Sequence, residues 1–214
     1  MRRTNSLLVI LALFAAAQIA TFNVRASRAQ ETSTLQEPQV TDVRLSGKKL
    51  FVIGENFSDG AIILINGVDV GTRNDPYNPT GMLIAKKGGK RIPPETVVSI
   101  AVQNSDGVKS QDFDLFSGLI ITLDDGSKTF HLKVGEKFLL LLKKDAIEWS
   151  VSVSDSSLIV RLAGEPAIPG AQGVFQAVRA GTTRLSAIGE YPCSKSRPPC
   201  LLPSLAFEVG FVIE

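Results

Sequence analysis

The chain has 214 residues, of which 44% are hydrophobic and 21% are charged, and its formal net charge is +2 at pH 7. A net charge so close to zero excludes binding to nucleic acid or anionic lipid through the electrostatic field of the whole protein. The length suits one large or two small domains.

Residues 1–29 have the pattern of a secretory signal peptide. Arg2 and Arg3 precede an apolar run at 7–17, and a polar stretch ends on small residues that allow cleavage after Ala29 or Ala26. The run is shorter than the roughly 20 residues that span a bilayer, and no second run of that length follows. We therefore expect a secreted or periplasmic protein with no membrane span. Cleavage removes four arginines and no acid, so the net charge becomes −2.

The first domain is expected at residues 38–116, after a flexible polar leader at 30–37. Apolar residues alternate there or form short runs, and glycine, asparagine, aspartate and proline separate them. This pattern is typical of an antiparallel β-sandwich. We expect strands at 40–45, 49–55, 61–65, 82–85, 96–103 and 111–115.

Three positions in this domain have a physical role that the sequence suggests. Gly54 lets the chain bend, Phe57 packs into the core at one end of the sandwich, and Asn66-Gly67 provides the positive φ values of a tight turn. Residues 50–72, LFVIGENFSDGAIILINGVDVGT, resemble the IPT/TIG family of immunoglobulin-like domains, as do residues 97–115. The resemblance covers about 38–115. It implies a spacer, an adhesive module or a carbohydrate-associated unit, and no shared active site.

A basic loop, LIAKKGGKRIPP, lies in the first domain. It carries Lys86, Lys87, Lys90 and Arg91 around a Gly-Gly turn. One hypothesis is that these cations bind an anionic sugar, a phosphate-bearing envelope polymer or an acidic protein patch. The alternative is a solvated hairpin whose charges prevent edge-to-edge aggregation.

The second domain is expected at residues 118–214, after a short hinge at 116–118. Asp125-Gly126 lies between two alternating runs and predicts a β-hairpin, and Gly135-Glu136 predicts a further turn. The fold class is therefore all-β, with two tandem immunoglobulin-like sandwiches after a cleaved signal peptide. We expect strands at 119–123, 129–134, 137–142, 148–153, 158–162, 173–177, 182–187 and 205–213.

The second domain is similar to bacterial immunoglobulin-like sandwiches and, in its hairpin VGEKFLLLL and its segment GVFQAVRAGTTRL, to chagasin-type cysteine protease inhibitors. In that inhibitor family, three loops at one end of the sandwich enter the protease cleft. One loop carries an NPTTG-like sequence before a tryptophan, and another carries RPW. Here KKDAIE precedes Trp149, and Arg197-Pro198 is followed by Pro199. The scaffold is thus similar, whereas the inhibitory loops are not matched.

Two single residues of the second domain have structural explanations. Trp149 lies in the alternating run EWSVSV, which is typical of the core anchor of an immunoglobulin-like sandwich, although a binding aromatic is the alternative. His131 shares a strand face with Thr129 and Lys133, so we expect it to face solvent. The continuous apolar run at 138–142 indicates a strand that is central or contacts the neighbouring domain.

Cys193 and Cys200, the only cysteines, enclose SKSRPP. In an exported protein this pair favours a disulfide, worth about 2 to 3 kcal/mol, over a metal site or a reactive thiol. A zinc site would need two more ligands, and His131 is the only histidine.

No motif for catalysis is evident, because the sequence lacks a nucleophile with a base, a phosphate-binding loop and a calcium loop. Asp124 and Asp125 are adjacent acids and are explained as turn formers. We therefore expect no enzyme, no metal and no cofactor. The predicted function is an exported structural, adhesive or binding module of the cell envelope or exterior, whose partner is a polymer or a protein and not nucleic acid. The alternative is a secreted cysteine protease inhibitor that acts through loops of the second domain.

Overall fold

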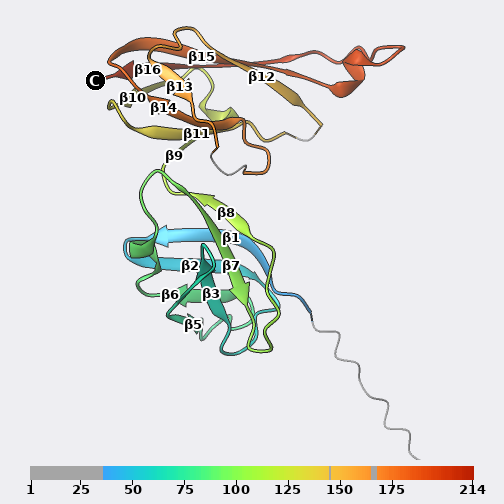
Figure 1. Ribbon diagram of the computed structural model, residues 1–214. Coiled ribbons are helices and arrows are strands. Elements are labelled where there is room, and N and C mark those ends of the chain that lie inside the picture. Colours follow the sequence, from blue (N-terminus) through green and yellow to red (C-terminus); the bar gives the residue numbers. More distant parts are fainter. Residues whose placement is uncertain (1–35, 145, 165–167) are drawn as a thin grey trace, which may run out of the picture. The chain divides into compact units, whose positions relative to one another are not determined.

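The computed structural model describes residues 36–144, 146–164 and 168–214. The predicted signal peptide and most of the leader lie outside these residues. The described chain is all-β, with four four-stranded sheets and three single-turn 3-10 helices, which confirms the predicted fold class (Figure 1). No helix in the described ranges is long and apolar enough to cross a membrane.

The first sandwich contains two antiparallel sheets. One has the strand order β1-β2-β6-β5 and the other β4-β3-β7-β8. Five of the six predicted strands are confirmed to within one residue at each end, and β8 begins two residues later than predicted. β4 and β5 were not predicted, because three residues are too few to show an alternating pattern. The bounds are β1 (Gln39–Ser46), β2 (Lys49–Glu55), β3 (Ile62–Ile65), β4 (Val68–Val70), β5 (Thr72–Asn74), β6 (Met82–Ala85), β7 (Val97–Gln103) and β8 (Phe113–Phe116).

Phe57 is 1% exposed and belongs to the core between these sheets, as predicted. Gly54 is required for a different reason from the one expected. A Cβ atom at Gly54 would lie 1.8 Å from the carbonyl oxygen of Gln39, so only glycine allows β1 and β2 to approach here. Asn66 and Gly67 have φ values of 50° and 76°, which confirms the tight turn between β3 and β4.

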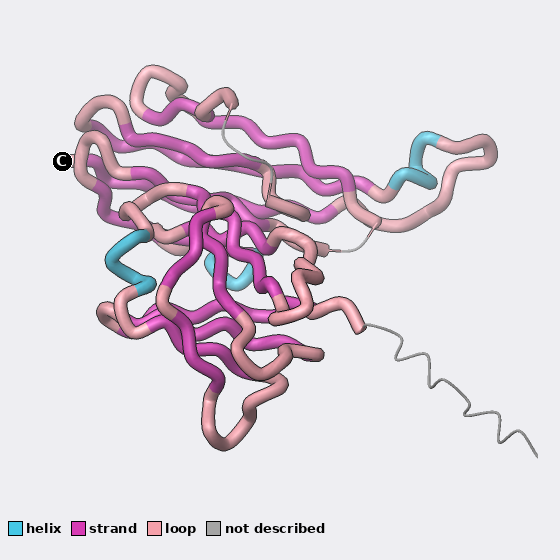
Figure 2. The backbone as a smooth tube through the Cα atoms, turned by 60° about the horizontal axis from the view of Figure 1, so that its bottom comes forward, coloured by secondary structure: helices cyan, strands magenta, loops and turns pink. Residues whose placement is uncertain are grey.

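The second sandwich also has two sheets, with the strand orders β13-β14-β11-β9 and β10-β16-β15-β12. Its strands run along the upper part of Figure 2. Two pairs in it, β9 with β11 and β10 with β16, are parallel, so the sandwich is mostly and not wholly antiparallel. The bounds are β9 (Leu119–Thr122), β10 (Thr129–Leu132), β11 (Lys137–Leu141), β12 (Glu148–Val153), β13 (Ile159–Arg161), β14 (Gly173–Ala177), β15 (Gly181–Glu190) and β16 (Leu205–Ile213).

The predicted hairpin at Asp125-Gly126 is wrong. The strands before and after it, β9 and β10, belong to different sheets. Gly126 has a φ of −50°, which does not fit the type I′ turn that the dipeptide suggested. Instead, Leu123–Asp125 forms a 3-10 turn. The Asp125 carboxylate accepts a hydrogen bond from the Thr122 backbone N–H at 2.8 Å and pairs with the Lys128 ammonium at 2.8 Å.

The core of the second sandwich is built around three stacked phenylalanines. Phe138 lies 5.4 Å from Phe175 and 4.9 Å from Phe211, measured between ring centroids. Alternate residues of β11 face away from this core, and one of them, Leu139, packs with Phe116 and Val174 in a smaller cluster. Both faces of β11 are thus covered, which explains the continuous apolar run at 138–142 and confirms its central position.

Candidate functional site

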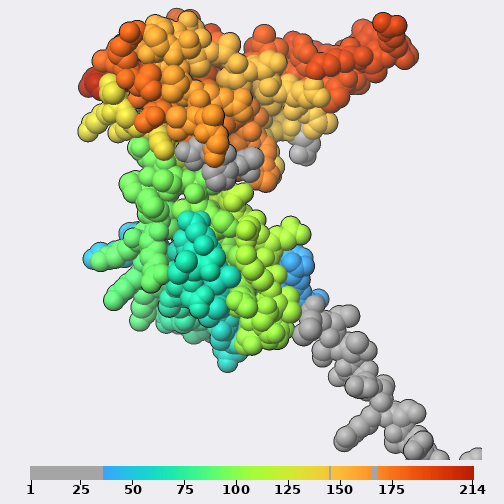
Figure 3. Space-filling model, in the orientation of Figure 1, coloured from blue at the N-terminus to red at the C-terminus, as the bar shows by residue number. Residues whose placement is uncertain are grey.

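The basic loop forms one end of the first sandwich. Lys86, Lys87, Lys90 and Arg91 are all exposed, and Gly88–Arg91 is a 3-10 turn. The loop is therefore not the hairpin that the alternative hypothesis assumed. Long side chains project from this green segment on one side of the sandwich (Figure 3).

The Gly-Gly pair lets this turn pack tightly against the strands beneath it. A Cβ atom at Gly88 would lie 2.8 Å from Leu50 Cβ, and one at Gly89 would lie 2.9 Å from the Gly47 carbonyl oxygen. The Gly89 N–H donates to the carbonyl of Lys48 at 3.1 Å. Consequently the β1–β2 turn, with two further lysines at 48 and 49, lies beside the loop.

Three of the four cations, Lys86, Lys87 and Arg91, line a small pocket of about 270 Å³. In the described part of the chain, none of the four predicted cations is in an ion pair. Arg91 Nη1 donates to the backbone carbonyl of Asp69 at 3.3 Å, which fixes its guanidinium beside the pocket. The lining residues are Val70, Gly71, Lys86, Lys87, Gly88 and Arg91.

The predicted disulfide between Cys193 and Cys200 is present, with a Cα–Cα distance of 5.4 Å. It closes the tip of an arm between β15 and β16 that extends past the ends of the other strands (Figure 1). Within the loop that the disulfide closes, the Lys195 ammonium contacts the carboxylate of Glu148, the first residue of β12, at 2.6 Å, and this hydrogen bond raises the pKa of Lys195. Leu201 on the arm is 97% exposed.

Two long-range contacts join loops of the second sandwich. The Leu142 backbone N–H donates to Gln172 Oε1 at 2.7 Å, which joins the loop after β11 to the loop before β14. The Lys195–Glu148 pair joins the arm to the start of β12. Sequence spacing did not reveal these contacts, because the partners are 30 and 47 residues apart.

Trp149 does pack against the core of the second sandwich, as predicted, but it is only half-buried. Its Nε1 is the one buried side-chain nitrogen or oxygen without a hydrogen-bond partner in the residues that the structure describes. The indole also lines a groove of about 500 Å³ between β12 and β13. No pattern in the sequence indicated this groove.

The remaining candidates do not assemble a reactive site. His131 is exposed on β10, as predicted. Asp125 is held by Lys128 and by the Thr122 N–H, which lower the pKa of its carboxyl. Within residues 36–144, 146–164 and 168–214, no three histidine, cysteine, aspartate or glutamate side chains gather to bind a metal.

No family model matches the sequence, and the comparison with curated proteins found no match. Three solved structures illustrate the likenesses of the fold. The cysteine protease inhibitor of Entamoeba histolytica is 15% identical, with 45% of this chain and 94% of that chain covered and a TM-score of 0.33. A Bacteroides ovatus glucan-utilization protein, solved with a mixed-linkage heptasaccharide, is 11% identical, with 83% and 45% covered and a TM-score of 0.28. The titin I9–I11 tandem is 9% identical, with 83% and 64% covered and a TM-score of 0.25. These values assign no function.

Proposed function

We propose that this chain is an exported, non-enzymatic binding module that holds an anionic envelope or extracellular polymer at the basic end of its first sandwich. The observation that carries the proposal is a loop with four exposed cations, Lys86, Lys87, Lys90 and Arg91, none of which is in an ion pair in the described residues. Three of them, Lys86, Lys87 and Arg91, line one pocket. After removal of the signal peptide the chain has a net charge of −2. The positive potential is therefore local and directed to one end.

A repeating polyanion suits this end better than a single small anion. The four side chains are exposed and separate, and lysine ammonium groups are flexible point charges. Several weak contacts to successive charges of a polymer add up, whereas each exposed pair alone contributes about 0–1 kcal/mol. The two lysines of the β1–β2 turn, Lys48 and Lys49, extend the same surface, since Lys49 precedes the register pair Leu50–Ala85.

Export and the absence of catalysis are parts of the same proposal. A disulfide such as Cys193–Cys200 persists in oxidising compartments, which agrees with the signal-peptide pattern of residues 1–29. Both cysteines are consumed by that bond. His131, the only histidine, faces solvent on its strand and has no role in the site.

The test measures binding of polygalacturonate to the mature chain by titration calorimetry, with dextran as the neutral control. The K86Q/K87Q/K90Q/R91Q variant is expected to bind at least about tenfold more weakly, and wild-type binding should fall as salt rises. The matched control, K133Q/K143Q/K144Q/R179Q, loses the same charge from the second sandwich and should bind normally. Equal losses in both variants, or no binding of polygalacturonate, would overturn the proposal.

One observation favours the alternative, a cysteine protease inhibitor. The Leu142–Gln172 contact joins the residue after β11 to the loop before β14, and the Lys195–Glu148 contact joins the disulfide arm to the start of β12. Inhibition of papain by the mature chain tests it, before and after reduction of Cys193–Cys200. Nanomolar inhibition that reduction abolishes would support the inhibitor, and no inhibition at micromolar protein would reject it.

A further inference from the structure

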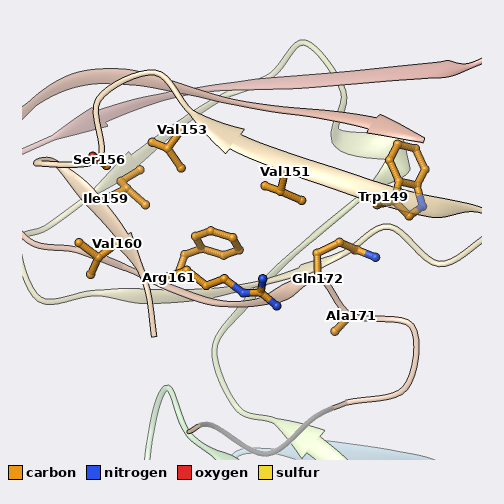
Figure 4. Close-up of a pocket in the computed structure, with 10 residues that line it drawn as sticks. Trp149, Val151, Val153, Ser156, Ile159, Val160, Arg161, Ala171 and Gln172 are labelled. Carbon is orange, nitrogen blue, oxygen red and sulfur yellow. The ribbon is translucent and has the colours of Figure 1, made fainter. Parts of the chain in front are cut away.

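The groove beside Trp149 lies between two edge strands. β12 is the edge of one sheet of the second sandwich and β13 is the edge of the other, so the side of the sandwich between them is not closed by a strand. Figure 4 shows the side chains of both strands facing the space between the sheets. The principal lining residues are Trp149, Val151, Val153, Ile159, Arg161 and Phe175.

Seven of the ten residues that line the groove have apolar side chains, and Ser156, Arg161 and Gln172 are polar. Val151 and Val153 on β12 are half-buried, although their position in the alternating strand directs them inward. Phe175, at 2% exposure, also lines the groove. The volume of about 500 Å³ falls in the range of about 300–1,000 Å³ that is typical of small-molecule sites.

Each polar side chain that lines the groove has a hydrogen-bond donor. The Arg161 side chain is exposed and, in the described residues, makes no ion pair or hydrogen bond. Gly173 makes room for it, since a Cβ atom there would lie 2.6 Å from Arg161 Nε. The Gln172 amide nitrogen donates to the Gly170 carbonyl. A ligand that complements this lining must bring a negative acceptor and an apolar body.

We propose that this groove binds a small aliphatic carboxylate. The carboxylate accepts hydrogen bonds from the Arg161 guanidinium, whose planar fork matches a carboxylate in a bidentate arrangement. The aliphatic chain packs against Trp149, Val151 and Phe175, where it removes apolar surface from water. This site is separate from the basic end of the first sandwich, so it stands or falls independently of the proposed polymer binding.

The tryptophan fluorescence of the protein reports on this groove alone, because Trp149 is the only tryptophan in the sequence. Octanoate is titrated against the mature protein while Trp149 fluorescence and the single indole N–H resonance are followed. Octanol is the matched neutral probe. Octanoate is expected to saturate both signals and to bind about tenfold or more tightly than octanol, because hydrogen bonds to a charged group add affinity. No saturable change up to about 10 mM octanoate, or equal binding of the two probes, would overturn the proposal.

Variants locate the carboxylate. R161Q should reduce octanoate binding to the level of octanol and leave octanol binding unchanged, and R161K should retain part of the difference because it keeps the charge and loses the fork. R179Q is the control, since Arg179 is an exposed cation of the same sandwich that contacts Ser157 and does not line the groove. If R161Q keeps wild-type octanoate affinity, or if R179Q reduces it equally, the assignment to Arg161 is wrong.

Discussion

The two sandwiches close their cores differently. In the first, Phe57 is 1% exposed and fills the end of the core, and Gly54 brings β1 and β2 together there. In the second, the side between β12 and β13 is open, and Trp149 is half-buried although it is the larger side chain. The same fold class thus yields one domain in which Phe57 fills the end of the core and one whose core borders a groove beside Trp149.

The largest expected effect is at the sealed core. Phe57→Ala should destabilise the first sandwich by about 3–5 kcal/mol, because it leaves a cavity among fully buried neighbours. Urea denaturation followed by circular dichroism measures this loss. Trp149 fluorescence reports the second sandwich alone and should shift less in the same experiment. A coincident, equal shift of both signals would show that the two sandwiches unfold as one unit.

The second largest loss of stability is expected when the disulfide of the arm is removed. C193S/C200S is expected to cost about 2–3 kcal/mol, since the bond restricts the unfolded chain. Urea denaturation followed by Trp149 fluorescence measures it, and reduction of the wild-type protein is the control that should reproduce it. An unchanged midpoint after reduction would contradict the expectation and show that the arm does not contribute to the stability of the sandwich.

A smaller effect is expected where the chain passes between the sheets of the second sandwich. Asp125→Asn should cost about 1 kcal/mol at pH 7, because it weakens the cap on the Thr122 N–H and removes the Lys128 ion pair. The folded-state pKa of Asp125 is lowered, so the stabilisation is present above its unfolded pKa of about 4 and is lost as pH falls through the folded value.

Urea midpoints of the wild type and D125N between pH 7 and pH 2 measure this dependence. The difference between them should shrink as the solution becomes more acidic. Lys109 forms the comparable ion pair with Asp112 in the first sandwich, so D112N is the control at a site that does not cap a turn. A difference that persists unchanged at pH 2 would show that the carboxylate charge is not its cause.

The smallest effect is expected at the open side. Trp149→Phe should cost less than about 1 kcal/mol, because the side chain is half-buried and the change also removes a buried N–H without an acceptor. Thermal unfolding by circular dichroism measures it, with Phe138→Leu in the sealed part of the same core as the comparison. A loss as large as that of Phe57→Ala would mean that Trp149 is a sealed core anchor and that the groove is closed in solution.

The strand positions could be predicted because a half-buried strand shows its period of two locally. β2, β6, β12, β14 and β16 begin and end at the predicted residues. β4 and β5 were too short for such a signal. The Asp125-Gly126 hairpin failed because the dipeptide is compatible with several turns, and the Asp125 cap selected one that carries the chain to the other sheet.

The candidate sites divide in the same way, into those with a local sequence signal and those without one. The cations at 86–91 and the cysteine pair are local in sequence, so composition and spacing found them. The groove is formed by Trp149, Ile159, Arg161 and Phe175 from three strands, and no local pattern joins these residues. The domain boundaries, the export signal and the role of the basic end stay predictions.

The sequence by itself determined the all-β class, most of the strand bounds, the disulfide and the basic loop, because each depends on residues that are near one another in the chain. Only the tertiary structure decided which strands pair and which edges stay open. Pairing depends on contacts between distant residues, such as the parallel contact of β10 with β16. Those contacts left β12 and β13 as facing edges, and they thereby placed Arg161 beside Trp149.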